Sequence, residues 1–177
     1  MMADEPPMSD ARGDAATEPT SDQHAALESR QVDQDRTLAS MHALEAALAS
    51  AAPGREGPWR DSVRAALDVL GAAAAEEEQN AAQPDSLLSD IARSQPRLRH
   101  RVHGLRAQYR QVCGTIAAIR PELDHQATAL DVADLRQRLA WLLTALRHQR
   151  ARESDLIYAA YYEAFDRDLE RDARSKP

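Results

Sequence analysis

Apolar residues recur at alternating spacings of four and three along four separate stretches of this chain, and this pattern constrains the fold more than any other feature. The most regular row comprises Leu98, Val102, Leu105, Tyr109, Val112, Ile116 and Ile119. Steps of four and three give a period of about 3.5 residues, which is typical of helices packed side by side, whereas a strand has a period of two. An aromatic content of 4% and only six glycines also favour helices over a β-sandwich or barrel.

Turn residues divide these rows into separate helices. Proline and glycine in "AAPGREGP" end the first helix, Pro84 ends the second, and Pro121 with "ELDHQATAL" forms the third connection. A short helix capped by Asp85 or Ser86 is expected in "DSLLSDIARS". The predicted long helices run from about 24 to 51, from about 58 to 83, from about 95 to 120 and from about 131 to 171. The sequence therefore predicts an all-α, antiparallel four-helix bundle over residues 24–171.

The two ends of the chain lack this pattern. Residues 1–23 contain three prolines and six acidic residues against a single arginine, so we expect a disordered acidic tail, and we expect a second, short tail at 172–177. No signal peptide and no membrane-spanning segment is recognised, so we expect a cytoplasmic protein. The single cysteine, Cys113, excludes an internal disulfide and is expected to be a small buried apolar residue.

Polar residues interrupt the apolar rows in the middle of the helices. Glu77 occupies a core position of the second row, and Gln149 and Glu153 occupy two successive positions of the fourth row. Counting residues from the connections places these positions, Tyr109 and Gln34 at comparable heights in a bundle. Because a buried polar group without a partner costs about 1 to 3 kcal/mol, we expect these five side chains to form one polar layer.

The order of three phrases, "MHALEAALASAAPGRE", "QPDSLLSDIARSQPRLRHRVHGLRAQY" and "ALRHQRARESDLIYAAYYEAF", resembles the hemerythrin-like family of HHE cation-binding domains. The resemblance covers residues 24–170 and rests on phrasing and order. It implies a four-helix bundle in which inward-facing histidines and carboxylates hold a non-haem di-iron centre that binds oxygen or senses redox state.

The sequence departs from the family pattern at most of the ligand positions. Glu77 stands at the second-helix histidine position, Tyr109 stands where the third helix usually has histidine, and Gln34 replaces the first-helix histidine. In the fourth helix, His148 and Glu153 have the family's five-residue spacing, whereas the period places Gln149 inward and His148 about 100° away. We favour the periodic register, which leaves Glu153 as the inherited ligand.

Two functions follow from this comparison. Our leading hypothesis is a hemerythrin-like bundle with a degenerate metal site, no bound cofactor, and a binding, sensing or scaffold role rather than catalysis. The alternative is a working protein that binds iron or another cation and engages oxygen or redox signals. Its candidate ligands are Glu77, Tyr109, Glu153, His148, Gln34 and Gln149. No phosphate-binding loop and no catalytic triad is recognised, so enzymatic activity is not expected.

Two further groups of residues suggest partners. Aromatic residues near the end of the fourth helix form a candidate surface for self-association or for a protein partner: Tyr158, Tyr161, Tyr162 and Phe165. A basic segment could attract an acidic partner: Arg93, Arg97, Arg99, Arg101, Arg106 and Arg110. The chain is acidic overall, with a net charge of -7, and this segment has no lysine-rich run, so we do not expect it to bind nucleic acid.

Overall fold

The computed structural model describes residues 21–50, 54–124 and 131–175, with side chains defined for most of them as far as Tyr161. Every regular element in these ranges is helical, which confirms the predicted all-α class. The elements are α1 (Ser21–Ala49), α2 (Glu56–Ala82), α3 (Leu87–Ser94), the 3₁₀ helix η1 (Pro96–Leu98), α4 (Arg99–Asp124) and α5 (Val132–Ser175). No helix in the described ranges is long and apolar enough to cross a bilayer.

Local sequence signals set several helix ends. The Ser86 hydroxyl accepts a hydrogen bond from the backbone N–H of Ser89 and caps α3. The Asp131 carboxylate accepts from the N–H groups of Ala133 and Asp134 at the start of α5, both at 3.0 Å. The expected tails 1–23 and 172–177 are too long, because α1 begins at Ser21 and α5 ends at Ser175, four residues beyond the predicted end. The rest of the two tails, residues 1–20 and 176–177, lies outside the described residues.

One predicted helix end is wrong. We expected Pro121 to end the third long helix, but α4 continues through it to Asp124. Proline removes a single hydrogen-bond donor from the last turn of a helix, which costs less there than in the middle. Leu123, which is fully buried in the core, anchors this last turn.

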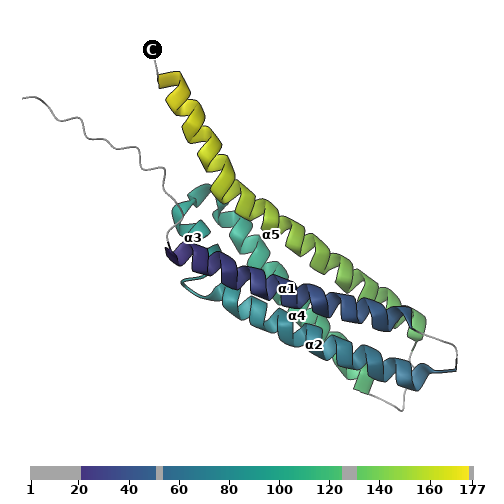
Figure 1. The fold of residues 1–177 in the computed structure, drawn as a ribbon. Coiled ribbons are helices and arrows are strands. Elements are labelled where there is room, and N and C mark those ends of the chain that lie inside the picture. The colour runs from purple at the N-terminus through teal and green to yellow at the C-terminus, as the bar shows by residue number, and fades with distance from the viewer. Residues whose placement is uncertain (1–20, 51–53, 125–130, 176–177) are drawn as a thin grey trace, which may run out of the picture.

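The four long helices lie side by side, with α3 beside one end of the group and the end of α5 extending past the other helices (Figure 1). Side-chain contacts fix the register between α1 and α5. Arg147 bonds to Glu45, and Arg136 donates to the backbone carbonyl of Leu48, so these two helices are in direct contact.

The core consists of two apolar clusters, one toward each end of the bundle. On α5 the first cluster ends at Leu146 and the second begins at Leu156, while on α2 the first ends at Ala74 and the second begins at Ala81. The buried residues Glu77, Gln149 and Glu153 fall in the interval between the clusters. A polar layer therefore divides the hydrophobic core.

The inward face of α1 differs from the prediction. The sequence predicts an apolar inward face made of Leu27, Leu38, Met41, Leu44 and Leu48. Met41 and Leu44 are buried, yet 40% of the Leu38 surface is exposed, and Leu27 and Leu48 are only partly buried. The buried positions in this part of α1 are polar instead: Arg30, Asp33, Thr37 and Ser40. The apolar residues in this part of α1 therefore did not indicate its inward face, because the side of the helix that contacts the other helices carries polar groups.

Candidate functional site

The side chain at the centre of the polar layer is Arg30 of α1. Its Nε and Nη2 atoms donate to the two carboxylate oxygens of Glu153, with Nη2 at 2.7 Å from Oε2. Nη2 also lies 2.5 Å from Oε1 of Glu77 and contacts the hydroxyl oxygen of Tyr109. A single guanidinium therefore joins α1, α2, α4 and α5, a task suited to its planar set of donors.

The cluster is shielded from solvent. Glu153 is 0% exposed, Glu77 1%, Tyr109 2% and Arg30 7%. Thr37 lies seven residues after Arg30 on the same buried side of α1, and its hydroxyl donates to the second oxygen of Glu77 at 2.9 Å. The Tyr109 ring lies 5.4 Å from the guanidinium carbon of Arg30, close enough for a cation–π contact.

The charges in this cluster do not balance, because one guanidinium faces two carboxylates. Burial raises the pKa of Glu77 above its usual value and the Glu153 charge adds to this, while Arg30 and Thr37 act in the opposite direction. Burial alone would lower the pKa of Arg30, but its hydrogen bond to Glu153 and the surrounding negative groups raise it overall. Arg30 is therefore a permanent cation, and Glu77 holds a proton more readily than an exposed glutamate.

Tyr109 remains a neutral phenol in this setting. Burial raises its pKa well above the ordinary range, and the nearby Glu153 and Glu77 carboxylates raise it further. Its hydroxyl oxygen accepts a hydrogen bond from Arg30. Because a phenol is also a donor, its proton is available to a neighbouring acceptor.

Three of the six candidate ligand residues come together around Arg30, namely Glu77, Tyr109 and Glu153. Gln149 is buried one turn before Glu153, and its side-chain oxygen has no hydrogen bond. His148 is exposed, so the period indicated the correct register for this part of α5.

Gln34 does not occupy the place that we predicted for it. It is half-buried, and its backbone carbonyl accepts a hydrogen bond from Arg150. The side chains that α1 brings to Glu77 are those of Arg30 and Thr37, four residues before and three residues after Gln34. Matching heights between helices identified the correct level but could not identify the correct face of α1.

The donor groups of the layer do not fit the di-iron centre that the family resemblance implies. Both carboxylates and the phenol are directed at Arg30, and a metal ion bound by the same oxygens would compete with that cation. Across the described ranges, no group of three or more histidine, cysteine, aspartate or glutamate side chains is arranged to hold a metal ion. The imidazoles that favour a stable iron pair are also missing, since His148 is outside the core.

Many of the arginines in the predicted basic segment make structural contacts. Arg97 donates to the carbonyl of Ala159 at 2.8 Å, and Arg106 donates to the carbonyl of Ala81 at 3.1 Å and to the Ser89 hydroxyl at 2.7 Å. These hydrogen bonds connect η1 to α5, and α4 to the end of α2 and the start of α3. Part of the basic character of this segment therefore serves the fold.

The predicted aromatic surface is described only in part. Tyr158 is 56% exposed, whereas Tyr161 is half-buried against the second apolar cluster, with its hydroxyl 3.4 Å from Asp90. Burial and the Asp90 carboxylate raise the pKa of Tyr161 to about 12. The side chains of Tyr162 and Phe165 lie outside the described residues.

Cys113 is half-buried against the first apolar cluster, and burial together with Glu78 raises the pKa of its thiol to about 12. Such a thiol is protonated at neutral pH and is a poor nucleophile.

Comparison of the chain with protein-family models, curated proteins and solved structures found no match.

Proposed function

We propose that this chain is a diverged, antiparallel hemerythrin-like bundle that acts without a metal, as a binding or scaffold protein rather than as an enzyme. The observation that carries the proposal is the position of Arg30. Its guanidinium engages Glu77, Tyr109 and Glu153, the residues that stand at or next to the family's ligand positions.

The exchange of a metal for an arginine has a clear electrostatic basis. Two buried carboxylates are unstable in an apolar interior unless a positive charge or a proton compensates them. Arg30 supplies a positive charge from within the chain, and the raised pKa of Glu77 makes a shared proton easier to hold. The bundle can then keep an ancestral polar layer while it no longer depends on a bound ion.

The burial of this layer also argues against catalysis at these residues. Glu77 and Glu153 are almost fully shielded from solvent and are already hydrogen-bonded within the protein. A general acid or base must reach a substrate directly or through one water molecule. The layer is better suited to fixing the register of the helices. A fixed register keeps the outer surfaces of the bundle in a constant arrangement.

Metal analysis tests this proposal. The protein is purified after growth in iron-supplemented medium, incubated with Fe²⁺ without oxygen, desalted and analysed for bound metal. We expect far less than one ion per chain in the wild-type protein. Near-stoichiometric iron that is lost in Glu77→Ala and Glu153→Ala would overturn the proposal in favour of the iron-binding alternative.

Arg30→Ala adds a sharper comparison. Removing the guanidinium leaves space beside two carboxylates and a phenol, so this variant should gain affinity for a divalent ion such as Mn²⁺, seen as a rise in thermal stability. The control is Arg36→Ala, which removes an exposed arginine whose partner Glu76 lies outside the layer. Equal Mn²⁺ responses in the wild type and in Arg30→Ala would contradict the role that we assign to Arg30.

A further inference from the structure

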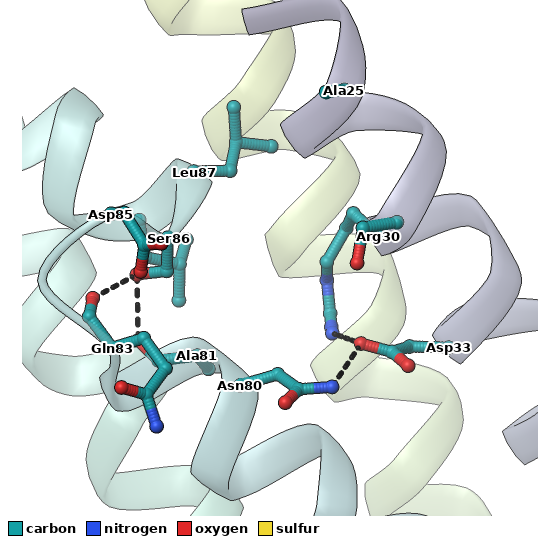
Figure 2. Close-up of a pocket in the computed structure, with 11 residues that line it drawn as sticks. Ala25, Arg30, Asp33, Asn80, Ala81, Gln83, Asp85, Ser86 and Leu87 are labelled. Atoms are coloured by element: carbon teal, nitrogen blue, oxygen red, sulfur yellow. Dashed lines mark hydrogen bonds and ion pairs between the residues drawn. The ribbon is translucent and has the colours of Figure 1, made fainter. Parts of the chain in front are cut away.

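A cavity of about 590 Å³ lies at one end of the bundle, between α1, the last turn of α2 and the start of α3 (Figure 2). Arg30 and Asp33 form one wall, Asn80 lies at the edge between α1 and α2, and Asp85 and Leu87 face them from the other side. The cavity has the size of a small-molecule site. It borders the polar layer, because Arg30 belongs to both.

One atom in this wall lacks the hydrogen bond that its burial demands. The Nη1 atom of Arg30 is buried without a hydrogen-bond acceptor, although the other two guanidinium nitrogens are fully used. The Asp33 carboxylate is 3.9 Å away, too far for a hydrogen bond, and the same Asp33 oxygen accepts from Asn80 at 2.9 Å. A ligand with a carbonyl oxygen would satisfy Nη1.

The charges around the cavity disfavour an anion. Asp33 and Asp85 are in its walls, and the negative end of the α2 dipole is close by, since Asn80 and Ala81 belong to the last turn of that helix. The charge of Arg30 is already compensated by Glu77 and Glu153 on its other side. A positively charged group on the ligand would therefore be favoured near the two aspartates.

The remaining wall is apolar. Leu87 and Leu88 are 4% and 1% exposed, and they line the cavity together with Ala25 and Ala81. A short aliphatic chain on the ligand could pack against this wall and be removed from water.

We propose that this cavity binds a small amine that carries a carbonyl group and a short aliphatic chain, the chemistry of an amino-acid amide. Its ammonium would be attracted by the negative charges of Asp33 and Asp85, its carbonyl would accept from Nη1 of Arg30, and its aliphatic chain would contact Leu87 and Leu88. This inference rests on the proposed binding role. The same chemistry is offered by a free amino-acid amide and by the amino terminus of a peptide.

Calorimetric titration with matched probes tests each part of the proposal. L-Leucinamide has all three groups, N-acetyl-L-leucinamide lacks the charge, and isoamylamine lacks the carbonyl. We expect one leucinamide per chain and affinities weaker by about tenfold or more for the other two probes. The tripeptide amide Leu-Gly-Gly-NH₂ distinguishes the two sources, since a free-molecule site would exclude the longer chain and a peptide site would bind it at least as tightly as leucinamide.

Two variants link binding to this cavity. Asp33→Asn and the exposed Asp85→Asn should each weaken leucinamide binding, whereas Asp124→Asn, at the end of α4, should leave it unchanged. Asp85→Asn keeps the test decisive if Asp33→Asn is poorly folded. The inference is overturned if leucinamide does not bind, if it binds no more tightly than the acetylated probe, or if Asp85→Asn has no effect. The metal analysis and this titration are independent measurements. If leucinamide does not bind, the proposal of a metal-free bundle is unaffected, and if iron binds, the proposal for the cavity is still tested by the titration.

Discussion

Glu77 on α2 and Glu153 on α5 are 76 positions apart in the sequence, yet both accept hydrogen bonds from the same nitrogen, Nη2 of Arg30. This shared donor lies between the two apolar clusters of the core. Because each partner comes from a different helix, the cluster specifies the relative height of the helices in a way that two interchangeable leucine layers would not.

Tyr109→Phe isolates the contribution of the phenolic hydroxyl. The variant keeps the ring beside Arg30 but removes the hydroxyl that accepts a hydrogen bond from the Arg30 guanidinium. Hydrogen bonds to charged groups contribute about 1.5 to 3 kcal/mol, so the free energy of unfolding should fall by about that amount in urea titrations. Tyr161→Phe is the control, because its 3.4 Å contact with Asp90 is weak, and a loss there as large as in Tyr109→Phe would contradict the account.

The raised pKa of Glu77 predicts a pH-dependent difference between the wild type and Glu77→Gln. Burial and the Glu153 charge make the folded protein bind this proton more tightly than the unfolded chain does. The contribution of Glu77 to stability is therefore fully present below its unfolded pKa and is lost as the pH rises through its folded pKa. Unfolding measured from about pH 4 to 8 should show Glu77→Gln gaining stability relative to the wild type.

Glu122 provides a control of opposite sign. Its hydrogen bond from Arg138 lowers the pKa of its carboxyl, so its contribution is present above the unfolded pKa and is lost as the pH falls through the folded pKa. Glu122→Gln should therefore lose stability relative to the wild type as the pH rises. The same pH trend in both variants would show that the trend does not come from the layer.

Gly71 and Gly114 test the close approach of α2 and α4. A Cβ atom at Gly71 would lie 3.1 Å from Cγ2 of the buried Ile116, whereas a Cβ at Gly114 would meet no atom within 4 Å. Gly71→Val should cost about 1 to 3 kcal/mol through overpacking. Gly114→Ala should stabilise the protein by about 0.5 to 1 kcal/mol because alanine is the better helix former. Thermal unfolding of both variants checks this, and equal shifts would contradict the packing of the two helices.

The sequence predicted the all-helical fold and four buried residues of the polar layer, because the apolar rows of three helices mark the inward face. On α2, α4 and α5 the rows contain enough large apolar residues to mark the inward face, so the polar residues that share those rows are also inward: Glu77, Tyr109, Gln149 and Glu153. The cap of α3 at Ser86, one of the two residues predicted for it, is decided by residues close by in the sequence. Pro121 was misjudged because its cost depends on the distance to the end of the helix.

Arg30 was missed because a lone arginine on a helix usually lies in solvent. A signal did exist, since stepping back from Leu44 and Met41 by four, four and three residues reaches Thr37, Asp33 and Arg30, all of which are buried. Counting the exposed Leu38 as a core residue shifted the predicted inward face of α1 away from this row. Which cation would balance the carboxylates could be decided only when all four helices were placed together.

The central claim is that Arg30 compensates the buried carboxylates, and a comparison of three variants tests it. Arg30→Met should lower the free energy of unfolding by about 3 to 5 kcal/mol, since it leaves two buried carboxylates without their cation. Arg36→Met, which breaks an ion pair that is half exposed on both sides, should cause a much smaller loss.

The decisive measurement is the urea unfolding of the triple variant Arg30→Met, Glu77→Gln, Glu153→Gln beside Arg30→Met alone. The account predicts that the triple variant is the more stable of the two, because removing the unpaired carboxylates relieves the cost of losing their partner. A triple variant that is no more stable than Arg30→Met would contradict the claim that Arg30 serves as the internal cation of this layer.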